Sequence, residues 1–200
     1  SIISTNPSLP AKNIAELIAL AKKKPDELSY ASFGNGSASH LAGELFTNQA
    51  GIKMTHIPYK GGGPAITDTL GGQVPMSFSA FGVALPHVKS GKLIALGTTG
   101  PTRARLLPDV PTIEEAGNLK AYEMSIVYAV WAPAGVPAPI VNKLTKALEQ
   151  VVASAAFKEK VSSDGGEVMN LSTPAESNAY FQKEMQRLSK IVKDGNIKAD

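Results

Sequence analysis

The sequence predicts an α/β fold in which a mainly parallel sheet carries helices on both faces. Strand-like runs alternate three or four times with helical stretches, and glycine-rich turns join them. The 200-residue chain is 43% hydrophobic and 18% charged, which is typical of one large globular domain or two small ones. These observations exclude a disordered tail, a collagen-like fibre and a small disulfide scaffold.

The first half of the chain carries the alternation. A helix is expected at 14–24, because Asn13 and Glu16 resemble a capping box and Pro25 ends the apolar spacing. A strand at 28–32 then leads through a glycine loop into helical spacing around Leu41. The later elements expected here are a strand at 55–59, a helix at 65–70, a strand at 74–79, a helix at 83–89 and a strand at 93–98.

The last part of the chain predicts helices and a single strand. Thr112 and Glu115 form a capping box for a short helix. Amphipathic helices are expected at 139–154, and from the Thr173 cap to about Lys193.

The predicted strand of this part lies at 124–132. This run alternates and is rich in Val, Ile and aromatic residues, so we expect it to be buried, with Tyr128 and Trp131 in the core. One strand cannot close an α/β core by itself. The region is therefore expected either to pack against the first half of the chain or to lack the strands that would complete its own core.

Several classes of site and partner are excluded. The chain has no cysteine, so disulfides and thiolate chemistry are impossible. His40, His56 and His87 have no second ligand at metal spacing, so no metal is expected. The net charge of +3 comes from scattered residues, which does not indicate nucleic-acid binding. Prolines and a glycine interrupt the uncharged stretch at 124–142, so no membrane span is expected, and the first residues do not read as a signal peptide.

Two glycine-rich turns provide the candidate binding site. Residues 33–37 join a strand to a helix and offer small side chains, hydroxyls and backbone N–H groups. Residues 60–64 repeat the arrangement, with Lys60 before three glycines. Because a helix N-terminus attracts anions, the two turns together predict a site for a carboxylate or phosphate. The alternative is purely structural, with glycines closing turns and serines capping helices.

Nucleotide cofactors and catalysis are less well supported. Ser39 stands where the dinucleotide fingerprint has its third glycine, and no Gly-Lys-Ser/Thr follows a glycine run, so no cofactor is expected. A hydrolase of small esters built on Ser37 and His40 is the enzymatic alternative. It lacks a nucleophile elbow and requires an acidic group to orient His40. Capping and packing are the favoured roles of this pair.

Five motifs occur in order along essentially the whole chain. They are Asn-Pro-Ser-Leu-Pro at 6–10, Tyr-Ala-Ser-Phe-Gly-Asn-Gly-Ser-Ala-Ser-His-Leu-Ala-Gly-Glu-Leu-Phe at 30–46, Ile-Pro-Tyr-Lys-Gly at 57–61, Leu-Gly-Gly-Gln-Val at 70–74 and Leu-Pro-Asp-Val-Pro-Thr at 107–112. Together they resemble the Bug family of periplasmic solute receptors of tripartite tricarboxylate transporters. The resemblance implies a two-lobed, periplasmic-binding-protein-like receptor that captures a small organic carboxylate without catalysis and delivers it to membrane permease subunits.

The resemblance also assigns binding residues. Those implied are Ser32, Asn35, Gly36, Ser37, Ser39, His40, Lys60, Gly61, Gly62, Gly63, Ala65, Ala80 and Phe81. Family members usually carry an aspartate where Ser79 and Ala80 stand here, so recognition of an amino group is not expected. A plain di- or tricarboxylate or an aromatic acid fits better.

The resemblance further implies a truncated receptor. The first-lobe segment that precedes Asn-Pro-Ser-Leu-Pro in the family is absent. Residues 7–119 then correspond to the second lobe, and residues 120–200 to the C-terminal portion of the first lobe without its own N-terminal strands. An apolar face left open in this way favours self-association. A sensor or scaffold that lost its transport role is a further alternative.

Overall fold

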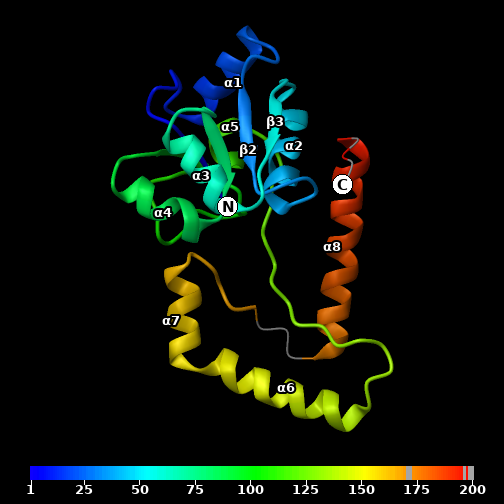
Figure 1. The fold of residues 1–200 in the computed structure, drawn as a ribbon. Coiled ribbons are helices and arrows are strands. Elements are labelled where there is room, and N and C mark those ends of the chain that lie inside the picture. The colour runs from blue at the N-terminus through cyan, green and yellow to red at the C-terminus, as the bar shows by residue number, and fades with distance from the viewer. Residues whose placement is uncertain (170–172, 196, 198–200) are drawn as a thin grey trace.

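The computed structural model describes residues 1–169, 173–195 and 197. A five-stranded sheet in the order β3-β2-β4-β1-β5 organises the first part of the chain (Figure 1). Its strands are β1 (Ile2–Thr5), β2 (Ser29–Ser32), β3 (Thr55–Pro58), β4 (Met76–Ser79) and β5 (Ile94–Thr98). The expected α/β class is confirmed.

The sheet is mixed. β2 pairs in parallel with β3 and β4, whereas β1 lies antiparallel between β4 and β5. Four strands therefore point one way and β1 opposes them. The sequence analysis expected four of these strands and missed β1, because a four-residue run of two isoleucines and two hydroxyl residues carries little local signal. β1 also precedes the expected start of the second lobe at residue 7.

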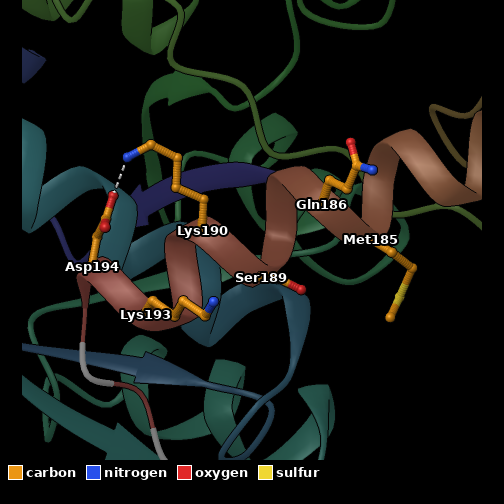
Figure 2. Close-up of a pocket in the computed structure, with 6 residues that line it drawn as sticks. All are labelled: Met185, Gln186, Ser189, Lys190, Lys193 and Asp194. Carbon is orange, nitrogen blue, oxygen red and sulfur yellow. Dashed lines mark hydrogen bonds and ion pairs between the residues drawn. The ribbon is translucent and has the colours of Figure 1, made fainter.

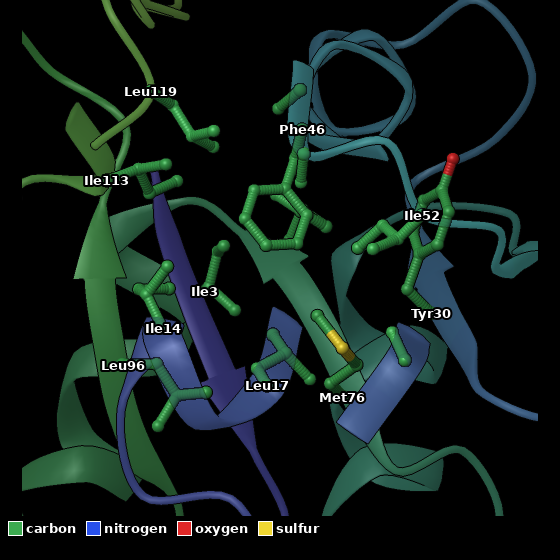
Figure 3. Packing of buried hydrophobic residues seen from close by; sticks show 14 of the residues in the cluster. Ile3, Ile14, Leu17, Tyr30, Phe46, Ile52, Met76, Leu96, Ile113 and Leu119 are labelled. Atoms are coloured by element: carbon green, nitrogen blue, oxygen red, sulfur yellow. The ribbon is translucent and has the colours of Figure 1, made fainter. Parts of the chain in front are cut away.

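Helices cover both faces of the sheet, as expected. They are α1 (Ile14–Lys23), α2 (Ala38–Ala50), α3 (Gly62–Leu70), α4 (Phe81–Lys89) and α5 (Ile113–Gly117). Successive residues of β1 show the two faces, since Ile3 packs in a cluster with residues of α1, α2 and α5, whereas Ile2 packs with residues of α3 and α4. Figure 3 shows the first cluster, in which Phe46 lies close to the sheet residues.

The chain stays attached to this sheet as far as Met124. The buried Tyr122 hydroxyl donates to the Ala42 carbonyl at 2.9 Å. The Met124 amide donates to the carbonyl of Thr99 at 2.8 Å, and the Thr99 hydroxyl donates back to the Met124 carbonyl at 2.6 Å. Residues 1–124 are called the sheet unit below.

Beyond the sheet unit, α6 (Ala138–Ala153), α7 (Ala155–Ser163) and α8 (Pro174–Asp194) form a helical region (Figure 1). The helices expected at 139–154 and from Thr173 are confirmed, and both the Thr112 and Thr173 capping boxes are present. The sequence analysis did not predict α7. Positions 170–172, 196 and 198–200 of the expected 120–200 region lie outside the described residues.

The predicted buried strand at 124–132 is wrong. Only Met124 in this run is buried, and the run forms no strand. Tyr128 is 88% exposed and Trp131 is 56% exposed, so neither belongs to the core. A strand needs a neighbour for its backbone hydrogen bonds, and beyond the Met124 amide, which bonds to Thr99, the described sheet offers none to this run. The alternation of apolar and polar residues within 124–132 contains no information about whether a neighbouring strand is present.

The helical region buries little of its apolar surface. None of the described residues of α6, α7 and α8 is buried, and Ile140, Leu144 and Val151 of α6 are each about half exposed. α8 is the part best attached to the sheet unit, through Leu188, which packs on the main core, and through a hydrogen bond from Arg187 to the Glu123 carbonyl. Among the described residues, no helix combines the length and apolar character needed to cross a bilayer.

Candidate functional site

The candidate site lies where β2, β3 and β4 end. Because these strands are parallel, their carboxyl ends share one edge of the sheet, and each is followed there by the start of α2, α3 or α4. The two glycine turns touch: the Tyr59 amide donates to the Ser32 carbonyl at 3.1 Å, and the Gly61 amide to the Phe33 carbonyl at 3.2 Å. The predicted turns are therefore neighbours in space.

The first turn is held mainly by its own hydroxyls. Ser37 caps α2 by accepting the His40 amide, and its Oγ donates to the Gly34 carbonyl at 2.6 Å. Ser39 Oγ accepts the Phe33 amide at 2.8 Å. The hydroxyls and several amides of the turn thus form hydrogen bonds that stabilise the conformation of the turn. The first-turn amides of α2 other than the capped His40 amide remain the natural anion donors, because helix geometry gives them no intrahelical acceptor.

The other two helix starts have no side-chain cap. Gly61 is the N-cap of α3 and Ala80 is the N-cap of α4, and neither supplies a capping hydrogen bond. Gly61 has a φ of 105°, which favours glycine. A Cβ on Gly62 would lie 3.0 Å from the Phe33 ring, so this position also needs a small residue. The amides at these two helix starts are thus not covered by capping side chains.

The remaining predicted residues occupy different depths. Ser32 and Ser39 are buried, and Ala65 lies in an apolar cluster with Ala31 and Val74 rather than at the edge. Lys60 and Gly63 are exposed, whereas Asn35 is partly buried. Phe81 lies against Gly165, where a Cβ would come within 2.7 Å of its ring, so the start of α4 touches the segment after α7.

A histidine pair beneath the first turn escaped the sequence analysis. The rings of His40 and His56 stack with centroids 3.8 Å apart and an interplanar angle of 8°. Burial lowers the pKa of both imidazoles, and the neighbouring His40 helps to lower the pKa of His56 to about 4. His40 was expected to contact ligand, yet its ring is buried under the turn. His40 belongs to α2 and His56 to β3, so the two rings meet only through tertiary structure.

The geometry does not assemble a nucleophile and base from Ser37 and His40. The Ser37 hydroxyl donates to the Gly34 carbonyl, and His40 Nδ1 accepts the Gly36 amide at 3.1 Å. Glu44 Oε1 does lie 3.7 Å from His40 Nε2, and it also accepts the Tyr30 hydroxyl at 2.6 Å. The serine and the ring therefore have separate partners that fix the turn.

A groove of about 410 Å³ lies on the outer surface of α8, away from the predicted residues (Figure 2). All of its lining residues come from this one helix, and Lys190 pairs there with Asp194 at 2.5 Å. One helix face offers no convergent polar groups from several elements, so this groove does not resemble a built ligand site. Within the described part of the chain, no cluster of three His, Asp or Glu residues could hold a metal ion.

Comparison with known proteins identifies the class. Residues 2–197 match the model of the tripartite tricarboxylate transporter family receptor, and the chain belongs to this family. It is 33% identical to Protein BugT of Bordetella pertussis over 98% of the chain and 60% of that protein. It covers 65% of the structure described as R. palustris Rpa4515 with adipate, with a TM-score of 0.90 and 31% identity over 98% of the chain. It also covers 65% of MatC from Rhodopseudomonas palustris with bound malate, with a TM-score of 0.82 and 26% identity over 96% of the chain.

The match to these relatives is partial along their length. The chain spans between 54% and 60% of the first three curated relatives. Its Bug-type, periplasmic-binding-protein-like fold is nevertheless matched over nearly all of its own residues. The expected family and fold are confirmed.

Proposed function

We propose that this chain is the carboxylate-binding portion of a non-catalytic solute receptor, and that it captures a small dicarboxylate at the shared edge of β2, β3 and β4. The observation that carries the proposal is the meeting of three helix starts there, two of which lack a side-chain cap. Relatives of the same fold contain adipate and malate, and both are dicarboxylates.

The physical basis is the strength of charge-assisted hydrogen bonds. An N–H bond to a carboxylate contributes about 1.5–3 kcal/mol, and each helix dipole adds about 0.3–1 kcal/mol. The edge offers amides from α2, α3 and α4, so both carboxylates of a short diacid find donors there without a metal. Ser79 and Ala80 place no acid at the third strand end, which favours ligands without an amino group.

The same proposal assigns each part of the chain to one lobe of the receptor. The sheet unit, which extends the expected range of 7–119 by β1 and by the attached residues up to Met124, forms the second lobe, and the helical region belongs to the first lobe. The family's role suggests that the receptor works in the periplasm and passes its solute to membrane permease subunits. The exposed apolar faces of α6 support the view that this lobe is completed by further protein, either additional strands or a second copy.

A charge placed at one helix start tests the binding site. Gly63 is the second residue of α3, it is exposed, and a Cβ there meets nothing within 4 Å. Gly63→Glu adds a negative charge at the N-terminus of α3. The helix dipole stabilises this charge, but the charge repels a carboxylate ligand. We expect calorimetric binding of malate or adipate to weaken at least about tenfold, with an unchanged melting temperature.

Ala175→Glu is the matched control. Ala175 is also exposed and is the second residue of α8, so the substitution adds the same charge to a helix start outside the site. It should leave dicarboxylate binding within about twofold of the unmodified chain. Equal weakening by both variants would indicate a general effect of net charge, and undiminished binding by Gly63→Glu would refute the assigned edge.

A further inference from the structure

The two stacked imidazoles are each tied to the first glycine turn. The Gly36 amide donates to His40 Nδ1 at 3.1 Å. His56 Nε2 lies 2.5 Å from Ser32 Oγ, which accepts the Gly34 amide at 3.2 Å. His40 comes from the first turn of α2 and His56 from β3. The pair therefore links the two glycine amides of the turn to two different elements.

A proton on His40 competes directly with Gly36. In the neutral ring Nδ1 is the acceptor, so Nε2 carries the hydrogen and faces Glu44 Oε1 at 3.7 Å. The ring can gain a proton only at Nδ1, because that nitrogen has the remaining lone pair. A charged His40 consequently cannot accept the Gly36 amide.

The groups around the pair favour its neutral form near pH 7. Burial disfavours charge on both rings, and two stacked imidazoles repel each other when both are charged. Glu44 from α2 is the acidic group that faces His40, and Tyr30 from β2 stacks on His56 at 5.1 Å and donates to Glu44. Tyr122 lies behind Tyr30 with its hydroxyl bonded to α2.

The Glu44 carboxylate determines whether protonation of His40 strengthens or weakens anion binding at the turn. A charge on His40 is offset by Glu44, so it adds little attraction for an anion at the turn. The lost Gly36 hydrogen bond has no such compensation, because no other acceptor on the ring replaces Nδ1. Acid should therefore loosen the turn more than it strengthens its positive potential.

We propose that the His40–His56 pair is a proton-sensitive positioning unit, which holds the turn at 33–37 in place at neutral pH and releases it on acidification. The consequence for ligand capture rests on the proposed function above. The response of the turn itself is a property of the fold and is measurable without ligand.

Nuclear magnetic resonance of the unliganded chain tests the turn directly. Between pH 7.5 and 4.5, the Gly36 amide signal should shift with the same midpoint as the His40 imidazole signals. The protection factor of the Gly36 amide, which is the intrinsic exchange rate at each pH divided by the measured rate, should fall over that range. His40→Gln retains an acceptor that does not titrate, so the acid response of Gly36 should be lost. His87→Gln, on α4, should leave the response unchanged. A Gly36 signal that ignores pH, or that titrates equally in His40→Gln, would overturn the proposal.

Calorimetry with malate gives the second readout. From pH 7.5 to 5.5 the Kd of the unmodified chain should rise by at most about tenfold, which is the rise that an ordinary imidazole pKa of 6.5 would give, because burial lowers the pKa of His40. His40→Gln should remove most of this dependence, and the part that remains reports protonation of malate itself. Absence of malate binding at pH 7.5 would contradict the proposed function, while the resonance experiment would still decide whether the pair positions the turn.

Discussion

The sheet unit and the helical region contain similar amphipathic helices with opposite fates. α1 buries Ile14, Leu17 and Ala21 against the sheet. α6 has the same kind of apolar stripe, yet Ile140 and Leu144 remain about half exposed. The difference lies outside the helices, because α1 has a sheet face to cover and α6 has none. Amphipathicity specifies which side of a helix seeks a partner, and only the rest of the protein supplies it.

The largest expected contrast is in core truncation. Phe46 is fully buried beside Phe78, so Phe46→Ala should destabilise the chain by about 3–5 kcal/mol. Leu144→Ala in α6 should change stability by less than about 0.5 kcal/mol. Urea denaturation monitored by circular dichroism measures both. Similar losses in the two variants would mean that α6 is packed in solution.

Acid should weaken the sheet unit through its histidine pair. The pKa of His56 is lowered from an ordinary 6.5 to about 4 in the folded chain, so the unfolded chain binds more protons between these values. Stability should fall as pH drops through this window, by about 1–2 kcal/mol after allowance for partial solvent exposure. Thermal melts of His56→Gln should show a shallower slope from pH 6.5 to 4 than melts of His87→Gln. Parallel slopes would exclude the pair as the source.

The two capping boxes offer a smaller contrast between the regions. Thr112 is 2% exposed and begins α5 inside the sheet unit, whereas Thr173 begins α8 and is exposed. Thr112→Ala should lower global stability by about 1–2 kcal/mol. Thr173→Ala should cost about 0.5–1 kcal/mol and act mainly on local opening of α8. Hydrogen exchange separates the two effects, and a global loss in Thr173→Ala would show that α8 unfolds with the sheet unit.

The smallest effect on stability is expected from a charge on the open face. Leu144→Lys removes an exposed apolar side chain from α6 and should leave the melting temperature nearly unchanged. Sedimentation velocity should show concentration-dependent self-association of the unmodified chain and less association of the variant. A monomer at all concentrations in both proteins would refute self-association through this face.

The sequence analysis was correct for features that depend on neighbouring residues and wrong for features that depend on residues far apart in the chain. The caps at Thr112 and Thr173 and the stop at Pro25 act within a few residues, so their residue types alone indicated the helix ends. β1 and the segment at 124–132 depend on partners far along the chain, and both were misjudged. The strand-turn-helix pattern predicted that the two glycine turns act together, but it did not show that His40 is buried against His56.

By itself the sequence determined the α/β class, most helix boundaries and the receptor family, because these depend on periodicity, local capping and ordered motifs. The tertiary structure alone decided the antiparallel place of β1, the exposure of Trp131 and the stacking of the two imidazoles. Each of these requires backbone or side-chain partners distant in the chain, and hydrogen bonding and packing between such partners leave no mark on local residue spacing.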